Sequence, residues 1–288
     1  MATVLITGTS TGIGLATALA FGRAGHRVAA TMRTPERAPA LADAATAEQL
    51  PITVLPMDVD TDASVREGVA RIEREIGPIG ILINNAGIER MGAVEELPLE
   101  AFRAVMETNY FGVIRCTQAV APGMRQRRSG CIVNVSSVAG HVATAPMAAY
   151  TASKFAPEAL SECLAQEMKA FGVRVAIVKP GIIDTAMARH IGVELAPSVY
   201  THQRRMAALF AAALKAPVPP SLVAEKILEV ATGATMQLRH PVGPDAEPFL
   251  GWRRSMTDEE WVDLGGLDDD AWYARIESDF GMDPRPIA

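Results

Sequence analysis

Cysteine is scarce in this chain, and its few cysteines are not spaced for a structural role. The sequence has three, Cys116, Cys131 and Cys163, an odd number without C-x-x-C spacing. A disulfide framework or a zinc site needs paired or closely spaced thiols. We therefore expect buried, reduced thiols and a cytoplasmic protein. The five histidines lack partners at ligand spacing, so we expect no metal site.

Long hydrophobic runs are also lacking. The longest unbroken apolar run is Met206–Leu214, which is much shorter than the roughly 20 residues needed to cross a bilayer. The strand-like run at 3–7 begins too close to the first residue to leave room for a signal peptide. We expect no transmembrane segment.

An excess of positive charge is missing as well. The 288 residues carry 33 acidic and 27 basic side chains, and residues 251–288 alone carry 10 acidic and 4 basic ones. Binding to nucleic-acid phosphates needs a basic excess, so we expect no nucleic-acid partner. Residues 251–288, which contain all three tryptophans, are interpreted as an acidic C-terminal extension.

Apolar, strand-like runs alternate with helical patterns through the first 180 residues. We expect strands at 3–6, 27–32, 52–57, 79–83, 131–135 and 173–178, and helices at 12–24, 62–76, 99–124 and 148–171. This alternation predicts a parallel sheet covered by helices on both faces. Farther on, the pattern predicts a helix at 221–232, a last strand at 235–238 and a proline-rich linker at 241–248.

A glycine-rich turn follows the first strand, with the sequence Thr7-Gly8-Thr9-Ser10-Thr11-Gly12-Ile13-Gly14. Glycines let the backbone approach a diphosphate closely, and the N-terminus of the next helix offers free N–H groups. This turn predicts a dinucleotide site.

Tyr150 and Lys154 are four residues apart at the start of a predicted helix, so they share one face of it. A free tyrosine has a pKa near 10, and a nearby ammonium group favours the phenolate and lowers that pKa. The pair therefore suits proton exchange with a carbonyl or an alcohol.

Four motifs together resemble the short-chain dehydrogenase/reductase family in order and spacing. They are the glycine turn, Asn84-Asn85-Ala86-Gly87, Tyr150-x-x-x-Lys154 and Pro180-Gly181. Two further segments, Ala30-Thr31-x-Arg33 and Pro241-Val242-Gly243-Pro244-Asp245, are similar to hydroxysteroid and retinol dehydrogenase-like members. The resemblance implies a Rossmann-type, doubly wound parallel sheet of about seven strands, within a catalytic domain at 1–250.

The resemblance also implies a set of site residues. The catalytic residues would be Asn109, Ser137, Tyr150 and Lys154. Tyr150 would exchange the proton, Ser137 would polarise the substrate oxygen, and Asn109 would hold a water beside Lys154. The cofactor would contact Gly8, Ser10, Gly12, Ile13, Gly14, Arg33, Asp58, Val59, Asn85, Ala86, Gly87, Tyr150, Lys154, Pro180, Gly181, Ile183 and Thr185.

Some of these positions have a plainer interpretation. Asp58 could cap the helix that begins near Asp62, and Asn84 is better interpreted as an amide that links strands. Pro157 predicts an interrupted turn in the helix below Lys154, because proline removes one helical hydrogen bond.

Two later segments are expected to shape the substrate cleft. Residues 186–220 are interpreted as a substrate lid, in which Met187–Leu214 presents an apolar face to a bulky apolar substrate. In the extension, Thr257-x-x-Glu260 is a capping-box pattern, and Trp272, Ile276 and Phe280 form one helical stripe. We expect residues 257–280 to be ordered and to dock by that stripe near the substrate entrance.

The sequence as a whole indicates an oxidoreductase that interconverts a ketone or aldehyde and an alcohol. Thr31 stands where NAD-binding relatives place an acidic residue, and the nearby Arg33 would attract a 2′-phosphate, so NADP(H) is expected over NAD(H). By analogy the chain forms a homodimer or homotetramer. Two alternatives stay open: an NADP(H)-binding regulatory protein without redox turnover, and a sugar-nucleotide epimerase or dehydratase. The latter enzymes usually need a larger C-terminal domain than the roughly 100 residues after Thr185.

Overall fold

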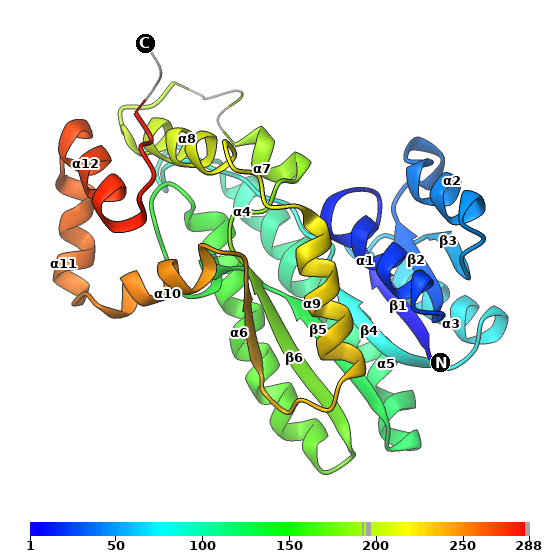
Figure 1. The fold of residues 1–288 in the computed structure, drawn as a ribbon. Coiled ribbons are helices and arrows are strands. Elements are labelled where there is room, and N and C mark those ends of the chain that lie inside the picture. The colour runs from blue at the N-terminus through cyan, green and yellow to red at the C-terminus, as the bar shows by residue number, and fades with distance from the viewer. Residues whose placement is uncertain (192, 194–196, 286–288) are drawn as a thin grey trace.

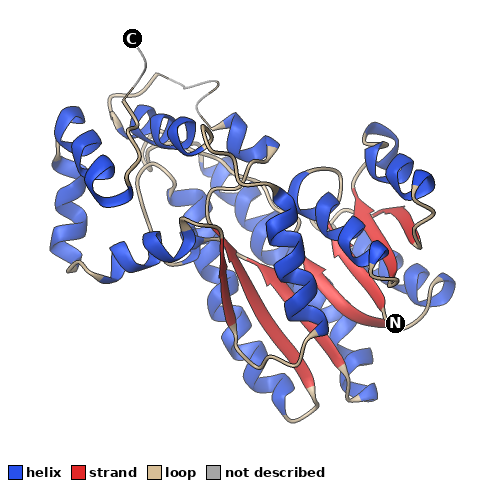
Figure 2. Ribbon diagram, in the orientation of Figure 1, coloured by secondary structure: helices blue, strands red, loops and turns tan. Residues whose placement is uncertain are grey.

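A seven-stranded parallel sheet forms the centre of the computed structural model, which describes residues 1–191, 193 and 197–285 (Figures 1 and 2). The strands are β1 Thr3–Thr7, β2 Arg27–Met32, β3 Ile52–Pro56, β4 Ile79–Asn84, β5 Gly130–Val135, β6 Val173–Pro180 and β7 Arg239–Val242. Their order is β3-β2-β1-β4-β5-β6-β7, and every neighbouring pair is parallel. The Rossmann-type, doubly wound sheet is confirmed.

Helices cover both faces of this sheet because successive strand residues point to opposite sides. Val4 and Ile6 pack in one core with α1 (Gly12–Arg23), α2 (Ala40–Ala47) and α9 (Pro220–Thr232). Leu5, between them in sequence, packs in the opposite core with α3 (Asp62–Glu75), α5 (Gly112–Arg127) and α6 (Ala148–Lys169).

A third group of helices lies beyond the carboxyl ends of the strands (Figure 1). It comprises α7 Ala186–His190, α8 His202–Ala213, α10 Ala246–Arg254, α11 Asp258–Asp263 and α12 Asp269–Phe280. Of these helices, α8, α10, α11 and α12 share a separate apolar cluster that includes Met206, Leu209, Phe249 and Ile276. Three short 3-10 turns complete the chain: η1 Pro35–Arg37, η3 Val138–Gly140 and η4 Leu264–Gly266.

The predicted end of the sheet is wrong in two places. The last strand is β7 at Arg239–Val242 and not 235–238, and most of the expected linker at 241–248 belongs to β7 and α10. Prolines suggested a linker, but Pro241 lies in an edge strand and Pro248 lies in the first turn of a helix, where the missing N–H is tolerated.

The long helix predicted at 99–124 is divided. It consists of α4 Leu99–Met106, a π-helical turn η2 at Glu107–Phe111, and α5. Pro157, in contrast, does not divide α6, which runs from Ala148 to Lys169 as one helix. The sequence also gave no signal for α2, whose buried residues are only Leu41 and Ala45.

The three cysteines do not share one environment. Cys116 and Cys131 are buried as expected, but Cys163 is exposed, because it faces outward from α6. Within the described ranges, no helix is long and apolar enough to span a bilayer.

The C-terminal extension packs on the same chain. Thr257 and Glu260 form the predicted capping box at the start of α11. Ile276 is 1% exposed, and Phe280 packs against Phe249 of α10 with ring centroids 4.6 Å apart. The nearly buried Arg205 of α8 donates to Asp269 at 2.7 Å and so ties α12 to α8. Residues 286–288 of the extension, like 192 and 194–196 of the expected lid, lie outside the described residues.

Candidate active site

The glycine turn is held at the point where the strand order reverses, between the carboxyl ends of β1 and β4. Gly8 has φ +69°, and a Cβ there would lie 2.7 Å from the Cα of Ala86. A Cβ on Gly14 would lie 2.2 Å from the Gly8 carbonyl oxygen. Both positions therefore require glycine.

Asn85 fixes the conformation of the glycine turn. Its side-chain amide donates to the carbonyl oxygens of Thr7 and Gly8, at 2.9 and 3.0 Å. The neighbouring Asn84 is buried and donates to Asn134 of β5 at 2.8 Å, which confirms it as an amide that links two strands. The two adjacent asparagines thus stabilise the loop and the sheet, respectively.

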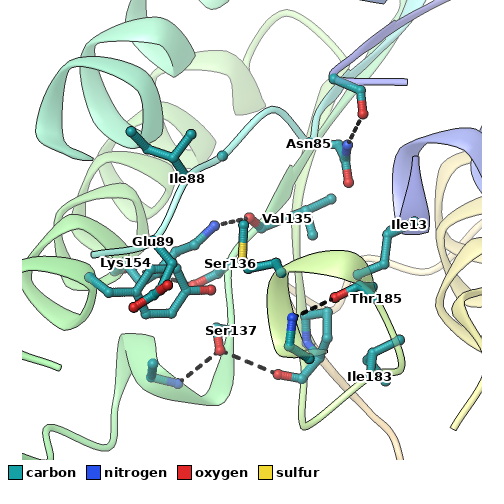
Figure 3. A pocket seen from close by; sticks show the side chains of 18 of the residues that line it. Ile13, Asn85, Ile88, Glu89, Val135, Ser136, Ser137, Lys154, Ile183 and Thr185 are labelled. Carbon is teal, nitrogen blue, oxygen red and sulfur yellow. Dashed lines mark hydrogen bonds between the residues drawn. The ribbon is translucent and has the colours of Figure 1, made fainter. Parts of the chain in front are cut away.

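One cavity of roughly 340 Å³ extends from the glycine turn to the apolar helices, and Figure 3 shows part of it. It brings together the predicted cofactor residues Gly8, Ser10, Gly12, Ile13, Gly14, Arg33, Asp58, Val59, Asn85, Ala86, Gly87, Pro180, Gly181, Ile183 and Thr185. Ser137, Tyr150 and Lys154 line it too. Asn109 is buried behind this lining.

The shape of this cavity fits an extended dinucleotide. Gly8 and Gly14 leave no room for a side chain in this turn, which lines the cavity and leads into the N-terminus of α1. Free backbone N–H groups at a helix N-terminus suit a diphosphate. Arg33 and Asp58 lie on the β2 and β3 side of this turn, whereas Tyr150 and Lys154 lie on the α6 side. A diphosphate at the turn would therefore place its two nucleoside ends toward these two groups.

At the β2 end, Thr31 and Arg33 have different environments. Thr31 is 1% exposed, and its hydroxyl donates to the Ile6 carbonyl oxygen at 3.1 Å, so it serves the sheet. Arg33 is exposed at the edge of the cavity. Asp58 also lines the cavity and accepts from the Asp60 backbone N–H at 3.1 Å. It therefore shapes its own turn, while α3 begins at Asp62 after Thr61.

Tyr150 stands between Ser137 and Lys154 in the cavity wall. The pKa of Tyr150 is raised to about 12, chiefly because burial disfavours the phenolate. The hydrogen bond with the Ser137 hydroxyl acts to lower this pKa, and the negative charge of Glu89 raises it further. The pKa of Tyr150 is thus raised and not lowered by Lys154 as expected, so the phenol keeps its proton at neutral pH.

Lys154 is held beneath Tyr150 and is 6% exposed. Its Nζ lies 5.7 Å from the centroid of the Tyr150 ring and donates to the Val135 carbonyl oxygen at 3.0 Å. Burial lowers the pKa of Lys154 to about 8, and the attraction of Glu158 opposes this shift. The ammonium group is therefore lost on a modest rise in pH.

Asn109 connects three segments from within the π-helical turn η2. Its Oδ1 accepts from the Ile88 backbone N–H at 2.8 Å, and its amide donates to the Ile88 carbonyl oxygen at 2.9 Å and to the Ser153 hydroxyl at 2.8 Å. The side chain is 2% exposed, so its hydrogen bonds are with the protein and not with bulk solvent. Local π-helical turns often occur at functional sites, because they redirect one side chain.

Two acidic residues take part in this site although the sequence assigned them no role in it. Asp245 ends the Pro241–Asp245 segment, and its Oδ2 accepts from the Ile182 backbone N–H at 2.7 Å. A Cβ on Gly181 would lie 2.1 Å from the Asp245 Oδ1, so this carboxyl holds the Pro180–Thr185 loop closely. Glu89 lines the cavity two residues after Gly87. The only signal for Asp245 was its place in the Pro-Val-Gly-Pro-Asp segment.

The far half of the cavity is apolar. Its lining comes from the segments expected to form a lid and from the loop before α6, and includes Val142, Met147, Met187, Ala188, Ile191, Met206, Leu209, Phe210 and Phe249. The extension supports this half, since Trp261 of α11 donates to the Ala143 carbonyl oxygen at 2.7 Å. Among the described residues, no cluster of His, Cys, Asp and Glu could hold a metal ion.

Comparison with known proteins defines the class. Residues 2–195 match the family model "short chain dehydrogenase". The chain is 34% identical over 268 residues to the oxidoreductase BOA17 of Botryotinia fuckeliana, covering 90% of this chain and 96% of that protein. The chain therefore belongs to the short-chain dehydrogenase/reductase family and is an NAD(P)-dependent oxidoreductase.

Two further similarities refine this picture. The chain is 40% identical over 188 residues to human retinol dehydrogenase 8, covering 64% of this chain and 59% of that protein. A crystal structure of a short-chain dehydrogenase from Streptomyces avermitilis superposes with a TM-score of 0.78 at 32% identity, covering 92% of this chain and 96% of that one. Similarity to retinol dehydrogenase-like members is confirmed.

Proposed function

We propose that this chain is an NADP(H)-dependent oxidoreductase that interconverts a bulky, apolar ketone or aldehyde with its alcohol. The observation that carries the proposal is the convergence of Ser137, Tyr150 and Lys154 in one cavity, between the glycine turn and the apolar helices. One of the relatives, retinol dehydrogenase 8, is named for an apolar alcohol, retinol. The bound nicotinamide supplies or accepts the hydride.

The side chains of this site divide the remaining work. Tyr150 Oη gives its proton to the substrate oxygen during reduction and takes it back during oxidation. Ser137, whose hydroxyl hydrogen-bonds the phenol, polarises the same oxygen. Lys154 supplies positive charge beneath Tyr150, and Asn109 positions the loop at Ile88 and the nearby helix turn at Ser153. The cofactor is held by the glycine turn and by three other segments that line the cavity. Their residues are Asp58 and Val59, Asn85–Gly87, and Pro180, Gly181, Ile183 and Thr185.

The cofactor preference rests on Arg33. Its exposed guanidinium borders the cavity beside the glycine turn, where it can bind a 2′-phosphate with forked donors, together with Ser10. We expect Arg33→Ala to lower kcat/KM for NADPH at least about tenfold and to change that for NADH little. Arg37→Ala, an exposed arginine of η1 in the same loop, is the matched control.

The test is a panel of ketones, aldehydes and alcohols, including steroids and retinoids, followed by nicotinamide absorbance with both cofactors. NADPH-dependent turnover of an apolar carbonyl supports the proposal. Tight NADPH binding without turnover of any carbonyl would favour the regulatory alternative. Equal or better efficiency with NADH, unchanged in Arg33→Ala, would contradict the cofactor preference.

We further propose that the catalytic domain at 1–250, with its 186–220 lid and its 251–288 extension, assembles into a homodimer or homotetramer in the cytoplasm. The exposed rings of Phe111 and Phe155, on η2 and α6, are 44% and 42% accessible and would be covered by a second copy. The exposed free thiol of Cys163 suits a reducing compartment. Sedimentation velocity should give at least twice the 30.6 kDa chain mass, and a monomer would contradict this.

A further inference from the structure

Glu89 places a carboxyl group in the substrate half of the cavity, and the proposed reaction does not use it. The residue lies in the loop after β4, and it lines the same cavity as Tyr150. Figure 3 shows Glu89 in the cavity wall near Lys154. Its Oε1 is buried and accepts no hydrogen bond from any residue that the structure describes. A carboxyl group with too few donors costs free energy when it is taken out of water. Because the half-buried Glu89 carboxyl lines the cavity, a ligand that brings a donor to it there is favoured.

The charged groups around Glu89 do not satisfy that oxygen. Arg90 and His190 attract its charge, but the Arg90 guanidinium donates to the Glu89 backbone carbonyl oxygen at 2.6 Å. Burial outweighs both attractions and raises the pKa of Glu89. The cavity beside it is otherwise lined by apolar side chains such as Met187, Leu209 and Phe249.

The carboxyl group is also close to the reacting centre. Its charge is near enough to the Tyr150 phenol to raise the pKa of that phenol. Because Tyr150 Oη marks the position of the substrate oxygen, a substituent that reaches Glu89 must be attached near the reacting carbon.

We propose that Glu89 is a specificity-determining residue that accepts a hydrogen bond from a hydroxyl or amino substituent beside the reacting carbonyl of the substrate. This inference rests on the proposed function. It names the substrate class as apolar hydroxyketones or aminoketones, with the corresponding diols or amino alcohols. A plain apolar ketone binds the same half of the cavity but leaves the Glu89 oxygen without a donor.

A matched set of substrates tests this in the full chain with NADPH. Acetophenone has no hydrogen-bond donor. 2-Hydroxy-1-phenylethanone carries a hydroxyl group, and 2-amino-1-phenylethanone an amino group, on the carbon beside the carbonyl. We expect kcat/KM for the hydroxyl or the amino compound to exceed that for acetophenone at least about tenfold, as for a hydrogen bond to a charged group. Glu89→Leu should abolish this ratio, and Glu89→Gln, which keeps an acceptor of the same shape, should retain part of it.

The ratio separates specificity from an effect on Tyr150. If Glu89 only tunes the Tyr150 phenol, Glu89→Leu changes the rates of all three substrates alike and leaves the ratio unchanged, which overturns the inference. Glu100→Gln, an exposed carboxylate of α4 outside the cavity, should leave the ratio as in the wild type.

Binding without turnover separates this inference from the proposed function. Calorimetry with the NADP⁺-loaded protein should give tighter binding of 1-phenylethane-1,2-diol than of 1-phenylethanol, and Glu89→Leu should remove the difference. That result supports the inference even when no carbonyl is reduced. Equal affinity for both alcohols, or binding of neither, overturns it.

Discussion

Burial favours the neutral forms of both titratable groups at the centre of the cavity. It raises the pKa of Tyr150 to about 12 and lowers the pKa of Lys154 to about 8. Below pH 8 the phenol holds its proton and the lysine is charged, whereas above pH 8 the phenol keeps its proton but loses the neighbouring cation. We therefore expect the proposed carbonyl reduction to depend on the protonation state of Lys154.

We predict that kcat/KM for carbonyl reduction at saturating NADPH falls as the pH rises through about 8. The charged form of Lys154 predominates below its lowered pKa and is lost above it, while Tyr150 titrates only near 12. Lys154→Met should reduce activity about 10²-fold or more and should remove this limb of the pH profile.

The matched control lies on the same helix. Lys169→Met replaces an exposed lysine in the last turn of α6 and should keep both the activity and the limb near pH 8. A wild-type profile that stays flat up to pH 10 would show that the charge of Lys154 does not contribute.

Motif spacing was sufficient to find residues that the fold brings together in one cavity, because their positions are fixed by strand ends. It did not reveal Glu89, nor the role of Asp245, which comes from a contact between distant segments. Asp245 meets Ile182 across 63 positions of sequence, a contact that no local pattern encodes. The lowering expected for the pKa of Tyr150 also failed, since spacing shows the neighbouring Lys154 but not the extent of burial.

At the scale of elements, buried strands and amphipathic helices were predicted well because their periodicity is strong. α3 illustrates this, since Val65, Val69 and Ile72 form its buried stripe as the sequence indicates. The failures are elements whose signal is weak or masked by proline. β7 contains Pro241, and η2 inserts a π-helical turn at Asn109 into an otherwise regular helical pattern.

The apolar stripe on α12, formed by Trp272, Ile276 and Phe280, leads to a prediction about stability and substrate binding. Ile276 is 1% exposed in the cluster that contains Met206, Leu209 and Phe249, three residues that also line the cavity. Ile276→Ala should lower the free energy of unfolding by about 2–5 kcal/mol, because a methylene-rich side chain is removed from a packed site. We also expect a higher KM for the carbonyl than in the wild type and little change in KM for NADPH.

Val262→Ala on α11 is the control for this substitution, because its side chain is 71% exposed and its loss should cost little. Urea unfolding measures the stability, and steady-state kinetics measure both KM values. If Ile276→Ala and Val262→Ala are equally stable, α12 does not contribute to the apolar cluster. An unchanged KM for the carbonyl would separate that cluster from substrate binding.

At the scale of the whole molecule, the sheet positions two unlike halves of one cavity. The reversal between β1 and β4 provides the half built from the glycine turn and the Asn85 loop. Helices α7, α8 and α10, beyond the strand ends, line the apolar half, and α11 and α12 pack beside them (Figure 1). Tyr150 and Ser137 lie where these halves meet, so in the proposed reaction the nicotinamide would occupy one half and the substrate the other.

The central claim is that Tyr150 exchanges the proton during this hydride transfer. Tyr150→Phe keeps the aromatic ring and the packing of α6 but removes the hydroxyl group. NADPH oxidation with the best carbonyl of the panel, measured for wild type and variant beside NADPH binding, tests the claim most directly. We predict that turnover falls about 10²–10⁴-fold while the dissociation constant for NADPH changes little, because the glycine turn is untouched. Near-native turnover in Tyr150→Phe would contradict the claim and would assign the proton to another group.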